Sequence, residues 1–119
     1  MKNKMLLGFI IAALPIVAQA AQDPIPNIIF VPKNAEIVEA EQKRFGGFEL
    51  EANVSNDTLS NLSDEVKNFY NEQGFSLHRE QADHDDVELK FIKEQESIEV
   101  DIELEHSGII EYSVDYETK

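Results

Sequence analysis

The chain has 119 residues, and 24 acidic against 10 basic side chains give a formal net charge of −14. This length leaves room for one domain, and hydrophobic residues at 42% are sufficient to build a core. The charge excludes a basic nucleic-acid-binding domain, because neutralising phosphates needs clustered Lys and Arg, and it also argues against binding to anionic membranes.

The N-terminus is typical of a secretory signal peptide. Lys2 and Lys4 precede the uncharged apolar run 5–17, and Ala18-Gln19-Ala20 supplies small residues for cleavage. The run is shorter than the about 20 residues that span a bilayer, although a short uncleaved anchor stays an alternative. We therefore predict a signal peptide at 1–20 and a periplasmic or secreted protein.

The chain has no cysteine. A lipid-anchored form that needs a cysteine at the cleavage site is therefore excluded, as are disulfides, thiolate zinc sites and a cysteine nucleophile. The mature domain must be stabilised by burial alone.

Three of the four prolines, Pro24, Pro26 and Pro32, fall in the segment 21–35 around the apolar run 28–31. Proline at this spacing excludes a helix and favours an extended segment. The segment is either an arm that lies over the domain and closes one end of the core, or an exposed strand that a partner adds to its sheet.

The rest of the chain, 36–119, reads as one α+β domain. Residues 35–42 could be a short strand, and Gly46-Gly47 marks a turn or bulge before a half-buried strand that alternates from Phe48 to Val54. A helix follows, with N-cap oxygens at 56–58, a single apolar stripe, and Gly74 as its end. The apolar residues of that stripe are Leu59, Leu62, Val66, Phe69 and Tyr70.

Four more strands are predicted at 75–80, 87–91, 98–104 and 110–116, joined by short connections that suit antiparallel hairpins. We therefore expect an antiparallel sheet of about five strands with one helix packed on its apolar face. The other sheet face is left to solvent or to a partner.

Several short motifs resemble a pattern of small exported bacterial domains of uncharacterised function. They are Val31-Pro32-Lys33-Asn34-Ala35-Glu36-Ile37-Val38, Phe48-Glu49-Leu50, Glu65-Val66-Lys67-Asn68-Phe69-Tyr70 and Gly74-Phe75. In that pattern a proline-alanine lead-in precedes a strand, and a helix ending in Phe-Tyr precedes a Gly-aromatic step into a β-meander. This chain has Phe75 where a tryptophan often stands. The resemblance implies the fold and export, and it implies no activity.

Acidic residues dominate 80–117, where Lys90 and Lys93 are the only Lys or Arg. Several acids alternate with apolar residues, so they are predicted to form one negative patch, with Ile92 and Phe30 as exposed apolar anchors. The predicted patch comprises Glu99, Asp101, Glu103, Glu105, Glu111 and Asp115. Such a patch would attract a basic protein or peptide; the alternative is a solvated face that only keeps the protein soluble.

The loop 82–86, with His78 nearby, invites a metal-site interpretation. It lacks the glycine and the terminal glutamate of a calcium loop, and His78, His84 and His106 do not have zinc spacing, so we expect no metal and no cofactor. We also find no nucleophile elbow, phosphate loop or dinucleotide fingerprint, and we expect no enzyme activity.

The sequence therefore favours a non-enzymatic periplasmic or secreted binding protein, in its most specific form an inhibitor or immunity protein against a basic cell-wall-degrading enzyme or toxin. One alternative is a small-ligand or cation-binding envelope module, with a narrow cavity lined by Phe69, Tyr70, Phe91 and Tyr112. Another is a structural accessory protein of the envelope.

Overall fold

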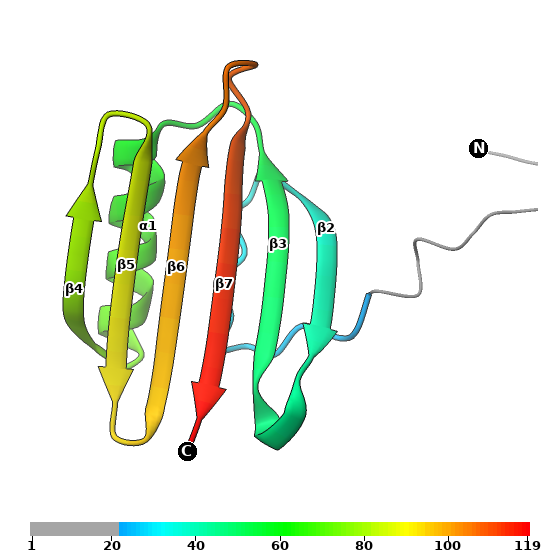
Figure 1. The fold of residues 1–119 in the computed structure, drawn as a ribbon, viewed down its shortest axis with the longest axis vertical. Helices are drawn as coiled ribbons and strands as arrows, with labels where there is room; N and C mark the ends of the chain where they lie inside the picture. Colours follow the sequence, from blue (N-terminus) through cyan, green and yellow to red (C-terminus); the bar gives the residue numbers. More distant parts are fainter. Residues whose placement is uncertain (1–21) are drawn as a thin grey trace, which may run out of the picture.

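The computed structural model describes residues 22–119, and the predicted signal peptide at 1–20 lies outside the described residues. The described chain forms a six-stranded antiparallel sheet with an α-helix behind it (Figure 1). Its elements are β2 (Ala35–Gln42), η2 (Arg44–Gly46), β3 (Phe48–Val54), α1 (Leu59–Glu72), β4 (Ser76–Ala82), β5 (Asp86–Lys93), β6 (Glu96–Leu104) and β7 (Ile110–Thr118). The strand order β2-β3-β7-β6-β5-β4 places the C-terminal strand between the β2–β3 hairpin and the β4–β6 meander.

The α+β class, the antiparallel sheet and the single helix of the described residues confirm the predicted architecture, but the expected number of about five strands is wrong, because the sheet has six. The additional strand is β2, whose residues 35–42 the sequence indicated only as a possible strand. Its pairing with β3 shifts register between Ile37 and Glu39, so residues on either side of this irregularity do not follow one period-two pattern.

Alternation along the strands gives the sheet a buried face and an open face. On β6, Val100 and Ile102 are buried while Asp101 and Glu103 are exposed. Burying one such Val or Ile side chain stabilises the fold by about 1.5–3 kcal/mol, and the sheet contributes many of them. The core residues from the sheet are Ala40, Phe48, Leu50, Ala52, Val54, Val87, Leu89, Phe91, Ile98, Val100, Ile102, Ile110, Tyr112 and Val114.

Helix α1 covers the β4–β6 half of the buried face (Figure 1). It begins at Thr58, whose side-chain oxygen accepts a 3.0 Å hydrogen bond from the Asn61 N–H, as an N-cap residue does. Its apolar stripe buries Leu62, Val66 and Tyr70 against the sheet. Gly74, with φ +92°, then turns the chain into β4, in agreement with the predicted end of the helix.

The proline-containing segment covers the other half of the buried face, where it runs behind β7 and β3 (Figure 1). Ile29 is only 4% exposed, and Phe30 makes backbone hydrogen bonds with the hydroxyls of Tyr70 and Tyr112. Near its start, Gln22 forms a parallel bridge with Ala40 of the edge strand β2. The described part of the segment therefore packs over the buried face of the sheet and contributes Ile29 to the core.

Within residues 22–119, no helix has the length and apolar character that crossing a membrane requires.

Candidate functional site

The open face of the sheet carries carboxylates in rows that run from strand to strand. In the central row, Glu88, Asp101, Ser113, Glu51 and Glu39 are paired in turn across β5, β6, β7, β3 and β2. We name the acidic face as the carboxylates of this row and its neighbouring rows: Glu39, Glu41, Glu49, Glu51, Asp86, Glu88, Glu99, Asp101, Glu103, Glu111, Asp115 and Glu117.

Many neighbours on the acidic face are like charges placed directly opposite each other. Glu103 is paired with both Asp86 and Glu111, and Asp101 is paired with Glu88. Opposed like charges on adjacent strands destabilise a sheet, by up to about 1 kcal/mol a pair. The like-charge pairs on the acidic face therefore destabilise the sheet, and the side chains buried on its other face offset this cost.

Cations compensate one end of the acidic face. Lys43 Nζ is paired with Asp115, lies 3.4 Å from Glu117 Oε2 and lies 3.8 Å from Glu49 Oε2. Desolvation alone would lower the pKa of Lys43, but its hydrogen bonds and charge interactions with Asp115 and Glu117 outweigh it, so the pKa is raised. Lys90 similarly lies 3.5 Å from Glu99.

The central part of the acidic face has no such compensation. Among residues 22–119, none of the ion pairs involves Asp101, Glu103 or Glu111. Desolvation, followed by the nearby carboxyls of Asp86, Glu88 and Glu103, raises the pKa of Asp101 to about 7. The pKa of Glu103 is also raised, chiefly by the charge of Glu105. In this described part of the chain, carboxyls without an ion-pair partner therefore lie close together around Asp101 and Glu103.

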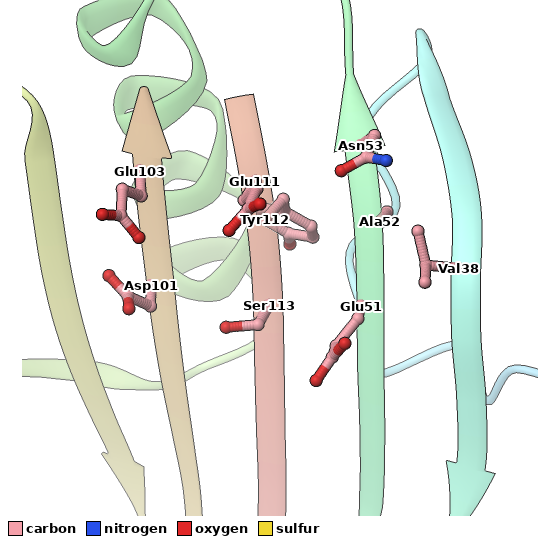
Figure 2. Close-up of a pocket in the computed structure, with 9 residues that line it drawn as sticks. All are labelled: Val38, Glu51, Ala52, Asn53, Asp101, Glu103, Glu111, Tyr112 and Ser113. Atoms are coloured by element: carbon pink, nitrogen blue, oxygen red, sulfur yellow. The ribbon is translucent and has the colours of Figure 1, made fainter. Parts of the chain in front are cut away.

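A hollow of about 320 Å³ opens on this central part (Figure 2). Carboxylates reach it from β6, β7 and β3, and Val38 of β2, which is 51% exposed, supplies an apolar wall. The lining residues are Val38, Glu51, Ala52, Asn53, Asp101, Glu103, Glu111, Tyr112 and Ser113. Apolar and anionic groups in one hollow fit a long cationic side chain, whose stem is apolar and whose head is charged.

Carboxylate oxygens in two groups of the described residues come within 4.8 Å of one another, close enough to share a hard cation. The groups are Asp86, Glu88, Asp101 and Glu103, Glu105, Glu111. Of the loop 82–86, only Asp86 joins a group, and His84 stands apart with its side chain 93% exposed. The loop therefore supplies one carboxylate to the sheet face and does not enclose an ion by itself.

The structure brings most of the predicted patch together. Register places Glu99, Asp101 and Glu103 on β6 beside Glu111 and Asp115 on β7. Glu105 lies in the turn after β6, and its carboxylate still reaches Glu103 and Glu111.

Neither predicted anchor is a fully exposed apolar side chain on the acidic face. Ile92 is on the open face, paired with Ser97, but it is partly buried. Phe30 lies in the arm on the opposite side of the sheet, with its ring centroid 5.2 Å from that of Phe69. A partner on the acidic face would not contact Phe30.

The residues proposed to line a ligand cavity are packed together. The ring centroid of Tyr70 lies 5.0 Å from that of Phe91, and Tyr112 is only 1% exposed. Phe69 packs edge-on against Tyr70 at 4.9 Å. Tyr70, Phe91 and Tyr112 therefore belong to the core, and Phe69, which is partly buried, packs against it.

Sequence reasoning missed an exposed aromatic residue at the tip of the β2–β3 hairpin. Phe45 is 87% exposed and has φ 59° and ψ 31°, in the left-handed region that costs a residue with a side chain about 1–2 kcal/mol. The signal in the sequence was an aromatic residue directly before Gly46-Gly47, a pair that was interpreted only as a turn.

Comparison with protein-family models, curated proteins and solved structures finds no match to this chain.

Proposed function

We propose that the protein is an exported, non-enzymatic binding protein whose acidic face docks a basic protein. The observation that carries this proposal is the group of opposed carboxylates on β6 and β7 that has no cation partner among the described residues, with Asp101, Glu103 and Glu111 at its centre. A basic protein would supply the missing positive charge, and the same field would steer it toward the sheet.

The competing explanation is that the acidic face only maintains solubility. Solubility depends on net charge and on the absence of apolar patches, and it gains nothing from placing acids directly opposite one another. The pairing of Glu103 with both Asp86 and Glu111 therefore favours a binding surface.

The hollow supports a particular mode of docking. A partner arginine could lay its stem on Val38 and place its guanidinium among Glu51, Glu103 and Glu111, which line the same hollow. Arginine forms planar paired hydrogen bonds with carboxylates and is enriched among the residues that dominate binding energy. We infer that at least one arginine of the partner enters here.

The most specific form of this function is inhibition or immunity against a cationic cell-wall-degrading enzyme or toxin. An acidic blocker would reach such an enzyme quickly, because opposite fields raise the association rate. Signal-directed export, which the N-terminal sequence predicts, would bring the protein to the compartment where these enzymes act.

The test is affinity capture from the envelope fraction of the producing cells with three purified baits. The first is the mature protein, and the second carries Glu99→Gln, Asp101→Asn, Glu103→Gln and Glu111→Gln. The third is a control of the same net charge, with Asp64→Asn, Glu65→Gln, Glu72→Gln and Asp83→Asn, all outside the acidic face.

We expect the first and third baits to retain the same basic protein and the second to lose it. The captured protein, once purified, should bind the mature protein directly. Equal loss from the second and third baits would show that capture responds to net charge alone, and full retention by both would show that it does not depend on the acidic face; either result rejects the proposal.

A further inference from the structure

We propose that Phe45 is the apolar anchor of the partner interface, and that the partner therefore carries an apolar pocket beside its basic surface. This inference rests on the proposed function for the nature of the partner, and it identifies the part of the interface that charge cannot supply. Charge complementarity mainly sets the association rate, whereas slow dissociation needs a desolvated aromatic or aliphatic anchor.

Phe45 is the large apolar side chain that the described residues expose most. It is 87% exposed, compared with 51% for Val38 and 45% for Leu77. Scattered apolar residues are normal on protein surfaces, so exposure alone would not indicate binding. The backbone of Phe45 supplies the second observation.

The tip holds Phe45 in a conformation that a phenylalanine seldom adopts. Its φ of 59° is positive, in the region that favours glycine, asparagine and aspartate. Local strain of this kind persists where the surrounding structure fixes it, and it concentrates at functional sites. Asparagine would fit this position with less strain, so the presence of phenylalanine calls for a reason other than folding.

Several contacts fix the tip rigidly against the end of β7. The Thr118 hydroxyl donates a 2.7 Å hydrogen bond to the Phe45 carbonyl, and the Lys43 N–H donates one of 2.8 Å to the Gly47 carbonyl. A Cβ on Gly47 would lie 2.8 Å from the Tyr116 carbonyl oxygen, so only glycine permits this close approach. The ring of Phe45 is therefore presented on an ordered support, which lowers the entropy lost on binding.

The tip borders the end of the acidic face whose charge Lys43 compensates, and the register of β7 places Glu111 toward the other end of the sheet. The tip lies at the same end of the sheet as the C-terminus (Figure 1), and Lys43 joins it to Asp115 and Glu117 through ion pairs. A hollow of about 470 Å³ beside the ring is lined by Lys43, Arg44, Phe45, Gly47, Glu117 and Thr118. One partner could contact the acidic face with basic residues and receive the Phe45 ring at the rim of the same interface.

The experiment distinguishes an effect of the Phe45 ring on binding from an effect on folding. Phe45→Asn removes the ring and keeps a residue that tolerates positive φ. Leu77→Asn is the control, because it removes an exposed apolar side chain from β4, at the opposite edge of the sheet. We expect Phe45→Asn to melt at the same temperature as the unaltered protein or a few degrees higher, which would establish that its effect on binding is not a folding defect.

Binding is then measured in two stages. A photo-crosslinking phenylalanine analogue at position 45 or 77 is used in the envelope of the producing cells to identify the protein in contact. That protein is purified, and its association and dissociation rates with each variant are determined. We expect crosslinking from position 45 only, a dissociation rate at least about ten-fold faster for Phe45→Asn, and rates within about two-fold of the original for Leu77→Asn.

The outcomes distinguish this inference from the proposed function. If the acidic-face bait loses its partner but Phe45→Asn leaves the dissociation rate within two-fold, the anchor is rejected and the proposed function stands. If Phe45→Asn speeds dissociation while neutralising the acidic face changes nothing, the proposed function fails and the anchor stands. Failure to crosslink any protein from position 45 rejects the anchor.

Discussion

The Tyr112 hydroxyl donates a 2.6 Å hydrogen bond to the carbonyl oxygen of Phe30, and this bond ties the arm to the central strand of the sheet. The Phe30 N–H in turn donates a 3.1 Å hydrogen bond to the hydroxyl of Tyr70 on α1. The N–H and the carbonyl of Phe30 are thus both hydrogen-bonded, the first to the helix and the second to the sheet. Because the arm packs on the buried face of the sheet, it leaves the open face uncovered.

Removing the Tyr112 hydroxyl should weaken the whole domain. We expect Tyr112→Phe to lower the free energy of unfolding by about 1–2 kcal/mol, because the Phe30 carbonyl loses its donor in a partly buried position. Urea denaturation measures this. The comparison is Tyr116→Phe, whose hydroxyl donates a 2.8 Å hydrogen bond to the Glu96 carboxylate and makes no contact with the arm. A loss below about 0.5 kcal/mol for Tyr112→Phe would mean that the bond to the arm contributes little to stability.

Neighbouring residues on β6 should respond oppositely to substitution. We expect Val100→Asp or Ile102→Asp to destabilise the fold by more than about 3 kcal/mol, because each buries an unpaired charge. Asp101→Ser should be neutral or stabilise by up to about 1 kcal/mol, because it relieves the repulsion from Glu88 and Glu103. Thermal and urea unfolding check both. Similar tolerance at positions 100 and 101 would contradict the assignment of the two faces.

The alternation of β6 and β7 shows why so much of the fold was predictable. Each residue in those strands faces either the core or solvent, so the pattern reports the strand and its buried side together. The same holds for the helix stripe that ends at Tyr70. The interruption between Ile37 and Glu39 is a local break in pairing, and a period-two pattern cannot show it.

Other features depend on contacts between distant segments. The sequence does not indicate that β7 inserts between β3 and β6, and this insertion is what brings Glu49 next to Asp115. Nor does it show that Phe30 turns inward onto Phe69 while Phe45 points outward. Both phenylalanines lie in irregular segments, and only the tertiary structure distinguishes the side chain that packs on the core from the one that is exposed to solvent.

Stability should fall as the pH rises from about 5 to about 8. The pKa of Asp101 in the folded protein is about 7, above its ordinary value of 3.8. Between these values the folded state binds more protons than the unfolded state, so raising the pH through this window removes stability. Thermal unfolding at pH 5 and pH 8 measures the change. We expect Asp101→Asn to flatten the dependence and Asp64→Asn, on the exposed side of α1, to leave it unaltered; an identical slope in all three proteins would contradict the assignment.

Divalent cations should stabilise the acidic face without selecting one ion. Because Asp86, Glu88 and Asp101 repel one another, low-millimolar calcium should raise the melting temperature modestly, and magnesium at equal concentration should do the same. Asp85→Asn should barely change the rise, since Asp85 lies outside this group. A rise confined to calcium or to micromolar zinc and abolished by Asp101→Asn would instead identify a specific metal site.

The most direct test of the acidic face as a docking surface is the association rate of the captured partner as a function of ionic strength. For the unaltered protein we predict fast association at about 0.02 M salt and a fall of about ten-fold or more by 0.15 M, where the Debye length is about 8 Å. Asp101→Asn combined with Glu103→Gln should slow association at low salt and flatten the salt dependence, with little effect on dissociation. An unchanged association rate and salt dependence in this variant would contradict the account, and would place the binding surface away from the acidic face.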